Sequence, residues 1–427
     1  MSESRVLVVG TTGDYIRWVS QHFPGRALFV TDHRIRQMAI DPPPPPGCEI
    51  LSDLSRPRQV RRDLAEHMKL HDIRPVGIVC YDCESMPLAA DLAASLGLPY
   101  PGATAIEMCR DKARCKAAWT AADVPCPASE VITTAEEALA FHEAHGECVL
   151  KPLTGTGSEL VFRCADATSV REAVRLIHQG LRARSHTRLY AGAAGRMAIE
   201  EFVSGPEFSC DFIVDDGRAK IVRLSRKIPM RGGPFGIIQG YRLPCELPPG
   251  NSLDLLVEIF GRAAAALELT RAMCMVDFLA SPRGPKLLEL APRPGGDCLP
   301  SVIRHAAGVD MLAEALNFAE GWPLAIPDFH GWKPTVGLRI YGRTEGVLSG
   351  VDFSAALADP RVLETHMLAA PGDRIVLPPK DYDSWVLGHL IFRPDPRLDL
   401  DAQCEDLLAK VRIEMKGRSC PPLPLSA

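Results

Sequence analysis

The sequence predicts a multidomain protein of α/β and α+β type, and three features of the chain support this. Its 427 residues are too many for one ordinary core, and about 100–200 residues per domain suggest two to four domains. The first hundred residues alternate short apolar strands with helices, which is typical of a parallel sheet. Longer amphipathic strands and hairpin turns follow, and the last hundred residues resemble a small β-rich unit.

In the first part, residues 5–10 and 11–23 predict a buried strand, a glycine turn and a helix. The alternation continues with two strands and a helix at 26–32, 77–82 and 86–98. The five prolines 42–46 predict an extended surface loop, and a docking site for a proline-binding partner is the alternative. A helix bounded by prolines over 96–127 marks a change of pattern, so we place a domain boundary near residue 105.

The second part is predicted to be rich in strands joined by hairpins. Turn residues at 214–219 and 281–286 separate neighbouring strands. The expected strands are 147–153, 158–164, 196–203, 207–225, 272–280 and 285–292. Beyond them, residues 332–399 predict a further β-rich unit and 401–415 a helix.

Composition and charge favour a globular protein without nucleic-acid or membrane partners. Hydrophobic residues make up 46% and charged residues 24%, and no apolar run approaches the length of a bilayer span. The net charge is only −5, and no basic run with interleaved aromatic residues occurs. Because the first ten residues lack the pattern of a signal peptide, we expect a cytoplasmic protein.

The fourteen cysteines are interpreted as reduced and mostly buried, since many lie inside apolar segments of a long chain. Cys80 and Cys83 have the spacing of a redox motif or half a zinc site. No second such pair follows, so we interpret them as incidental thiols.

The segment 151–162, KPLTGTGSELVF, combines a lysine with a glycine-rich loop. Glycines at alternate positions let backbone N–H groups turn toward an anion, and Lys151 adds a positive charge. A phosphate cradle and a plain hairpin turn are both compatible with the segment taken alone. The pattern is neither a P-loop nor GxGxxG.

Two acids further along predict a metal site. Asp277 and Glu289 lie on two expected strands joined by a short turn, so a hairpin would bring both carboxylates to one face. Mg²⁺ in nucleotide sites typically uses one or two carboxylates together with phosphate oxygens. Arg293, just beyond the second acid, adds a fork of donors for an anion.

Taken in order along the chain, these motifs resemble those of the ATP-grasp enzymes, and most closely the carboxylate–amine ligases that include the L-amino acid ligases. The resemblance covers nearly the whole chain. It implies a Rossmann-like pre-ATP-grasp domain at 1–105 and an ATP-grasp domain of two α+β subdomains at 106–325. The flexible subdomain would lie at about 125–200, and a small β-rich lid domain at 326–427.

The resemblance also implies which residues hold ATP. Lys112 matches a lysine that reaches the phosphates, and Lys151 matches a second. The loop expected to close over the phosphates consists of Thr154, Gly155, Thr156, Gly157 and Ser158. The residues expected at the adenine edge are Glu200, Glu201, Phe202 and Val203, with Glu207 at the ribose hydroxyls.

Asp277 and Glu289 match the Mg²⁺ ligands of the family, with Mn²⁺ as an alternative metal. Arg293 matches the arginine that holds the transferred phosphate. Arg293 and Lys151 are the predicted catalytic residues. Residues 224–244 are similar to an acceptor segment and 366–392 to a lid. The predicted substrate contacts are Lys227, Gln239, Tyr241, Arg293, Gly295 and Gly296.

Three positions depart from the family pattern. Asp277 stands where glutamate is usual, which shortens one ligand by a methylene group. Ala291 replaces a common asparagine and removes an oxygen ligand. Gln239 and Tyr241 stand where many amino acid ligases carry an acid and a histidine, so the substrate does not follow from the relatives.

The resemblance implies an ATP-dependent ligase that joins a small carboxylate and an amine, on amino acid-like substrates, through an acyl phosphate. ADP and phosphate would be released, and a homodimer is compatible with this expectation. Three alternatives stay open: a carboxylase that uses bicarbonate, an ATP-binding protein without turnover, and a scaffold that uses residues 42–46 to recruit a partner.

Overall fold

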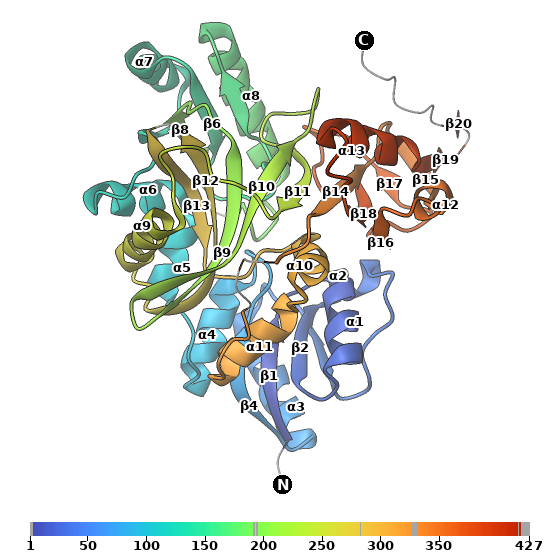
Figure 1. The fold of residues 1–427 in the computed structure, drawn as a ribbon. Coiled ribbons are helices and arrows are strands. Elements are labelled where there is room, and N and C mark those ends of the chain that lie inside the picture. Colours follow the sequence, from blue (N-terminus) through green and yellow to red (C-terminus); the bar gives the residue numbers. More distant parts are fainter. Residues whose placement is uncertain are drawn as a thin grey trace.

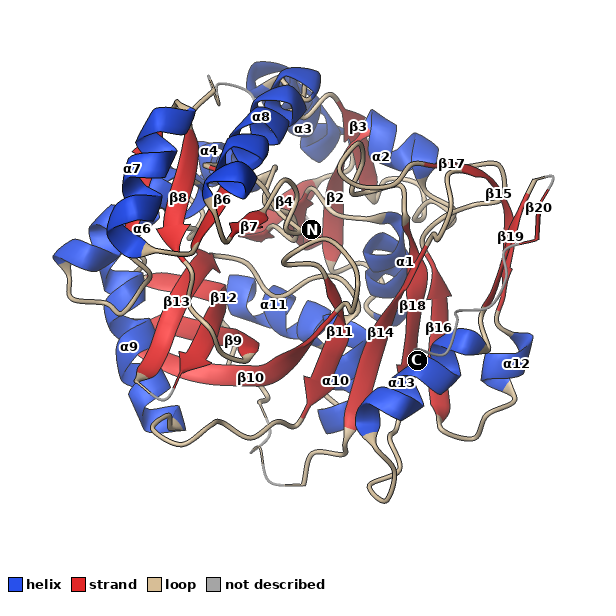
Figure 2. Cartoon of the chain, turned by 90° about the horizontal axis from the view of Figure 1, so that it is seen from above, coloured by secondary structure: helices blue, strands red, loops and turns tan. Residues whose placement is uncertain are grey.

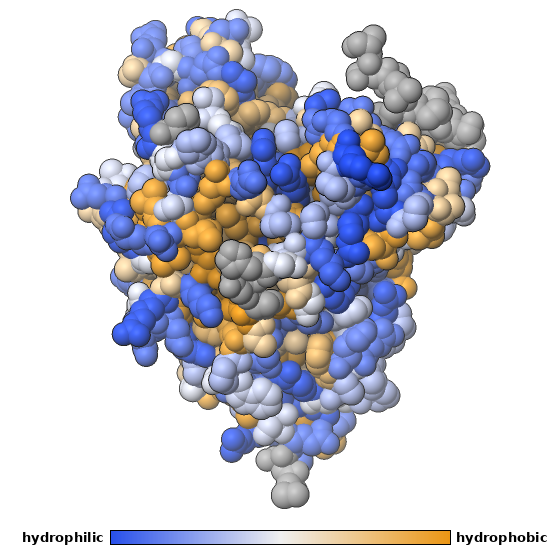
Figure 3. Space-filling view, viewed as in Figure 1, coloured by the Kyte–Doolittle hydropathy of each residue, from blue (hydrophilic) through white to orange (hydrophobic). Residues whose placement is uncertain are grey.

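The computed structural model describes residues 3–190, 193, 195–281, 283–326, 329, 331–416 and 418–419, and the strands within them form four sheets. Figure 1 shows an amino-terminal domain, a lobe that carries α7 and α8, and a carboxyl-terminal lobe around α12 and α13. In the space-filling view the two upper lobes stand apart at the top of the molecule, and their outer surfaces are largely hydrophilic (Figure 3). No helix of the described segments is long and apolar enough to cross a bilayer.

The amino-terminal domain contains the predicted parallel sheet, in the order β3-β2-β1-β4. Its strands are β1 (Glu3–Val9), β2 (Ala27–Asp32), β3 (Glu49–Ser52) and β4 (Ile73–Val79). Its helices are α1 (Gly13–His22), α2 (His33–Met38), α3 (Pro57–Leu70) and α4 (Met86–Leu96). The proline run 42–46 is an irregular and mostly exposed loop, as predicted.

The segment 96–127 contains two helices, which corrects the prediction of one. They are α5 (Ala103–Arg110) and α6 (Lys112–Ala121). Asp111 ends the first helix and caps the second, because its carboxylate accepts hydrogen bonds from the N–H groups of Ala113 and Arg114 at 2.9 and 3.1 Å. The cap places Lys112 at the first position of α6.

A small sheet in the order β5-β8-β6-β7 carries the glycine loop. Its strands are β5 (Ser129–Ile132), β6 (Cys148–Pro152), β7 (Phe162–Cys164) and β8 (Met197–Glu201). The helices α7 (Ala135–His145) and α8 (Ala167–Ala183) pack on it, and both begin with a capping box.

The strand predicted over 158–164 is shorter than expected and begins at Phe162. Ser158 and Leu160 have φ angles of 60° and 56°, which a strand does not allow. The buried Leu160 packs against α8, where a Cβ on Gly180 would lie 2.5 Å from its side chain. Packing on α8 thus extends the glycine loop into the expected strand.

The largest sheet has eight strands in the order β13-β12-β9-β10-β11-β14-β18-β16, which Figure 2 shows as one curved row. Both predicted hairpins are confirmed, because β9 pairs with β10 and β12 with β13. The strands are β9 (Glu207–Asp215), β10 (Arg218–Pro229), β11 (Ile238–Leu243), β12 (Arg271–Ser281), β13 (Gly284–Ala291), β14 (Thr335–Tyr341), β16 (Val362–Met367) and β18 (Val386–Phe392).

Three helices connect this sheet to its surroundings. They are α9 (Leu253–Ala266), α10 (Leu299–Ala307) and α11 (Met311–Glu320). α9 packs on β10, α10 packs on β11 and β14, and α11 packs on β1 and β4 of the amino-terminal sheet. The predicted boundary near 325 falls between α11 and β14. Because β14 pairs with β11, this boundary separates strands that are hydrogen-bonded within the same sheet.

The last sheet has the order β17-β15-β19-β20. Its strands are β15 (Gly346–Asp352), β17 (Arg374–Ile375), β19 (Arg412–Met415) and β20 (Arg418–Ser419), with helices α12 (Ser354–Leu357) and α13 (Leu400–Ala409). The helix predicted over 401–415 was wrong beyond Ala409. Val411, Ile413 and Met415 are buried and alternate with exposed residues, which is the two-residue period of a strand.

The thirteen cysteines in the described segments are free, and most are buried, as predicted.

One buried ion pair supports the loop that lines the site. The guanidinium group of Arg223, 0% exposed, donates two hydrogen bonds of 2.8 Å to the carboxylate of Asp211. The same carboxylate accepts a 2.9 Å hydrogen bond from the N–H of Gly295. The pair therefore anchors the loop that follows β13.

We expect Asp211→Ala to lower the free energy of unfolding by about 3–5 kcal/mol, because it leaves a buried guanidinium without its partner. Asp215→Ala is a matched control on the same strand, since Asp215 is 58% exposed in a surface pair with Arg271. Urea unfolding followed by tryptophan fluorescence would compare the two. Equal small losses would contradict a structural role for the buried pair.

Candidate active site

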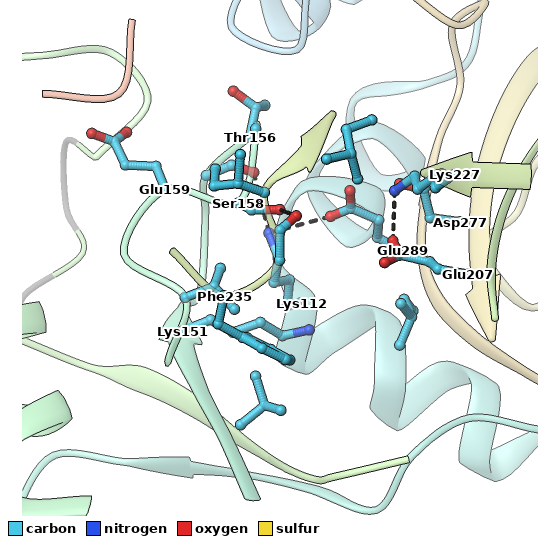
Figure 4. Close-up of a pocket in the computed structure, with 18 of the residues that line it drawn as sticks. Lys112, Lys151, Thr156, Ser158, Glu159, Glu207, Lys227, Phe235, Asp277 and Glu289 are labelled. Carbon is cyan, nitrogen blue, oxygen red and sulfur yellow. Dashed lines mark hydrogen bonds and ion pairs between the residues drawn. The ribbon is translucent and has the colours of Figure 1, made fainter. Parts of the chain in front are cut away.

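A cavity of about 760 Å³ lies between the glycine loop and the eight-stranded sheet. Most predicted site residues line it, as the close-up in Figure 4 illustrates. They are Lys112, Lys151, Thr154, Gly155, Thr156, Gly157, Ser158, Glu200, Glu201, Phe202, Val203, Glu207, Lys227, Tyr241, Asp277, Glu289, Arg293 and Gly296. The volume is within the range of ligand-binding pockets.

Gln239 and Gly295 are not among the lining residues. The side-chain amide of Gln239 donates a 2.7 Å hydrogen bond to the carbonyl of Arg339 on the neighbouring strand. Gly295 supports the loop through Asp211, and a Cβ at this position would lie 2.9 Å from Arg223. Neither residue forms part of the cavity surface. Both support the strands and the loop that surround the cavity.

The glycine loop lies over the cavity in a conformation that suits an anion. Gly155 and Gly157 have φ angles of 150° and 64°, which side chains disfavour. The Nζ of Lys112 donates to the carbonyl of Gly155 at 3.2 Å, and the N–H of Lys112 donates to the carbonyl of Leu153 at 2.9 Å. The first turn of α6 and the loop are thus bound together.

The ammonium group of Lys151 is part of a buried cluster of charged side chains. Its Nζ lies 2.9 Å from Glu200, whose carboxylate is also 3.7 Å from the Nζ of Lys116. Burial alone would raise the pKa of Glu200, but the ammonium groups of Lys116 and Lys151 outweigh it and lower the pKa. Burial lowers the pKa of Lys116. The sequence interpretation missed Lys116, although its position four residues after Lys112 puts both on one face of a helix.

The two predicted metal ligands face each other across β12 and β13, since Asp277 is the direct register partner of Glu289. Figure 4 shows Lys227 between Glu207 and Asp277, with its Nζ 2.6 and 2.5 Å from their carboxylates. Burial opposes the positive charge on Lys227, but the two carboxylates raise its pKa. Lys227 therefore remains an ammonium group inside the site.

Glu289 lies 3.5 Å from the Nζ of Lys112. Burial acts to raise the pKa of Glu289, but the surrounding cations, chiefly Lys112 and Lys227, hold it below its usual range. The buried Oδ1 of Asp277 has no hydrogen-bond partner among the described residues. An ionised carboxylate opposite a carboxylate oxygen with no partner fits a divalent cation.

Within the described segments no group of three or more histidine, cysteine, aspartate or glutamate residues has the geometry of a metal site. A Mg²⁺ ion held by Asp277 and Glu289 would therefore complete its shell with phosphate oxygens and water, as Mg²⁺ in nucleotide sites does. Ala291 lines the cavity at the end of β13 and offers no side-chain oxygen.

Arg293 extends from the loop after β13 toward the amino-terminal domain. Its Nε donates to the sulfur of Cys83 at 3.0 Å, and one terminal nitrogen donates to the carbonyl of Pro294 at 2.9 Å. Cys83 also lines the cavity, so the amino-terminal domain supplies part of the wall. No local pattern in the sequence indicates this contact, because it joins residues 210 positions apart.

Known proteins resemble this chain in sequence and in fold. A family model for the ATP-grasp domain matches residues 145–301. The chain is 26% identical over 294 residues to protein y4rH of Sinorhizobium fredii and 26% over 289 residues to human carnosine synthase 1. These matches cover 67% and 65% of this chain, but it spans only 57% and 34% of the length of the two relatives.

Two solved structures are similar over almost the whole chain. The L-amino acid ligase from Bacillus licheniformis has a TM-score of 0.75 at 15% identity, with 97% of this chain and 99% of the other covered. The biotin carboxylase domain of the 2-oxoglutarate carboxylase from Hydrogenobacter thermophilus, solved with MgADP and bicarbonate, has a TM-score of 0.68 at 18% identity. There the coverage is 97% and 91%.

Residues 145–301 thus match the ATP-grasp domain family. The fold of the chain is that of the L-amino acid ligase, which confirms the predicted resemblance and fold class.

We expect Lys112→Met to weaken ATP binding about 10- to 100-fold, because the substitution would remove the charge-assisted contact to the phosphates that the resemblance predicts. Lys69→Met, on the exposed face of α3, is the control. Calorimetric titration with MgATP measures both. If Lys112→Met bound MgATP as tightly as the control, the lysine would not face the phosphates.

Proposed function

We propose that this protein is an ATP-dependent ligase that joins a carboxylate to an amine through an acyl phosphate, releasing ADP and phosphate. The observation that carries the proposal is one continuous cavity. The glycine loop, Lys112 and Lys151 line this cavity together with the acid pair, Lys227 and Arg293. Donors for a polyphosphate and a site for a transferred phosphate thus share one space.

The proposed nucleotide contacts follow from this arrangement. The phosphates of ATP would be held by Lys112, Lys151 and the N–H groups of residues 154–158, and the adenine edge by residues 200–203. Asp277 and Glu289 would hold Mg²⁺, which neutralises phosphate charge, and Mn²⁺ is an alternative metal. The similar carboxylase domain was solved with MgADP.

Side chains of the protein would stabilise the charge that develops on the reacting groups and hold those groups in position. Lys227 and Arg293 offset the charge that develops as a substrate carboxylate attacks the γ-phosphorus. The resulting acyl phosphate is attacked by the amine at its carbonyl carbon, and the bond to the phosphate oxygen breaks with its electron pair. The oxyanion of that step would lie against Arg293. No side chain is needed as a nucleophile.

Exclusion of water is the second task of the site, because an acyl phosphate hydrolyses. Ser158 Oγ donates a 2.8 Å hydrogen bond to the carbonyl of Gly236, which joins the glycine loop to the loop between β10 and β11. The two loops thus cover the cavity together. This is the arrangement expected of a lid that protects a reactive intermediate.

A second candidate is supported by the similarity to the carboxylase domain solved with bicarbonate. In that case bicarbonate would take the place of the substrate carboxylate. The purified protein is therefore incubated with MgATP and amino acids in pairs, with and without bicarbonate, and phosphate release is combined with mass detection. Release that depends on the pair, with a product one water lighter than the two amino acids, supports the ligase. Release that depends on bicarbonate supports the carboxylase.

We expect Glu289→Ala to lower turnover about 100-fold or more, since it removes one of two metal-binding carboxylates. Glu258→Ala, on the surface of α9 where Glu258 is 67% exposed, is the control. ADP formation and nucleotide binding are measured on both. An unchanged rate in Glu289→Ala would remove the metal assignment, and nucleotide binding without turnover in the unmodified protein would favour a non-catalytic role.

A further inference from the structure

Arg293 is the cation that the proposed function places at the transferred phosphate, and the direction of its side chain needs an explanation. Pro292 and Pro294 flank it and restrict the backbone on both sides. The N–H of Arg293 also donates a 2.8 Å hydrogen bond to the carbonyl of Ala291. The backbone is therefore fixed, whereas the direction of the long, flexible side chain depends on contacts at its tip.

The guanidinium group of Arg293 makes two such contacts within the described part of the chain. Its Nε donates to the sulfur of Cys83 at 3.0 Å, and Nη1 donates to the carbonyl of Pro294 at 2.9 Å. An arginine has five N–H donors, so three remain, including both on Nη2. Because Arg293 lines the cavity, these remaining donors are available to an anion bound there.

Cys83 lies in the turn between β4 and α4, and hydrogen bonds within the turn stabilise it. The carboxylate of Asp82 accepts from the N–H and the hydroxyl of Ser85 at 2.5 and 3.0 Å. Ser85 is 0% exposed, and a Cβ on Gly10, directly after β1, would lie 2.1 Å from its Oγ. The glycine thus lets the turns after two neighbouring strands approach each other closely. The sulfur of Cys83 is therefore presented to Arg293 by a closely packed turn.

A thiol suits this position because it directs the guanidinium group without neutralising it. A carboxylate here would form an ion pair with Arg293 and compete with phosphate for its donors. The two acids next to the thiol in sequence are engaged elsewhere. The carboxylate of Asp82 is bonded within the turn, and that of Glu84 lies 3.6 Å from Arg188. An uncharged thiol is only a weak acceptor, so the positive charge stays available to the ligand.

The two cysteines of the motif at 80–83 differ in their surroundings. Cys80 is 2% exposed and donates its S–H to the carbonyl of Asp82 at 3.0 Å. It is not among the residues that line the cavity, whereas Cys83 is. The spacing of the two thiols therefore matters less than the place of the second one.

A third cysteine makes a similar contact away from the cavity. Nη1 of Arg5 donates to the sulfur of Cys48 at 3.4 Å. Cys48 is partly buried, as Cys83 is, but it does not line the cavity. It is therefore a matched control for the loss of a thiol that accepts from an arginine.

We propose that Cys83 is a positioning residue, which holds the guanidinium group of Arg293 by its Nε and leaves Nη2 free for the transferred phosphate. Cys83 itself touches no reacting atom and acts through Arg293. This inference rests on the proposed ligase function.

The test measures the first half-reaction alone. Hydroxylamine attacks the carbonyl carbon of an acyl phosphate, and the bond to the phosphate oxygen breaks with its electron pair, which gives a hydroxamate and phosphate. The purified protein is incubated with MgATP, hydroxylamine and each of the twenty amino acids as the carboxylate. The kcat of hydroxamate formation is measured at saturating substrate, and the Kd of MgATP is measured by calorimetric titration.

In Cys83→Ala we expect kcat to fall about 3- to 10-fold with the Kd of MgATP unchanged, because the guanidinium group loses its fixed direction. Cys83→Ser supplies an oxygen acceptor and should recover most of the loss. A lysine has a carbon atom where arginine has Nε, so adding Cys83→Ala to Arg293→Lys should cost nothing further. Cys48→Ala should match the unmodified protein.

The outcomes separate the inference from the proposed function. If the unmodified protein forms no hydroxamate with any amino acid, the proposed function fails and the inference fails with it. If hydroxamate forms, an unchanged kcat in Cys83→Ala overturns the inference alone. An equal loss in the Arg293→Lys background does the same, as does a Cys83→Ser variant no better than Cys83→Ala. A general folding defect would weaken MgATP binding together with kcat, which also contradicts a positioning role.

Discussion

The antiparallel pairing of β12 with β13 is the constraint on which the rest of the site depends. It sets Asp277 opposite Glu289, and side chains in direct cross-strand register lie on the same face within contact of each other. Two carboxylates so placed would repel each other. Asp277 is buried, whereas the side chain of Glu289 is 40% exposed. Lys227 and Lys112 each contact one of them and supply the opposing charge. The acids and the lysines are therefore one electrostatic unit, in which removing any charge alters the others.

The eight-stranded sheet extends this unit into a row of polar groups. From the acid pair the row passes through Lys227 on β10 and Tyr241 on β11 to Arg339 on β14. Neighbouring strands are about 4.8 Å apart, so the sheet spaces these groups evenly without loops of its own. The glycine loop and the loop after β13 then close the two ends of the row. A sheet with a loop at each end of this row is an arrangement that can hold two substrates in fixed relation.

The parts of the site that the sequence could reveal are those in which neighbours along the chain act together. The glycine loop is one such part, and the hairpin acids are another, because a short turn fixes their register. Asp297 and Arg339 meet only through the order of strands in the sheet, which no local pattern encodes. Gln239, predicted to contact the substrate, does not line the cavity, and its amide donates a hydrogen bond to the main chain of β14. The helix predicted over 401–415 was wrong beyond Ala409. The residues up to Ala409 do form a helix, and the alternation of buried and exposed residues that marks a strand begins only after them.

The glycine loop and the residue next to it make contacts outside their own subdomain. Glu159, next to the loop, is paired with Arg184 and accepts a 2.5 Å hydrogen bond from Tyr190. Arg184 in turn donates to the carbonyls of Pro379 and Lys380 in the carboxyl-terminal part, at 3.2 and 2.8 Å. Ser158 meets the loop between β10 and β11. Lys112 also donates a hydrogen bond to the carbonyl of Gly155, so under the proposed function its ammonium group would exchange that bond for one to phosphate. The glycine loop is thus joined through Glu159 and Arg184 to the carboxyl-terminal part, and through Ser158 to the loop between β10 and β11.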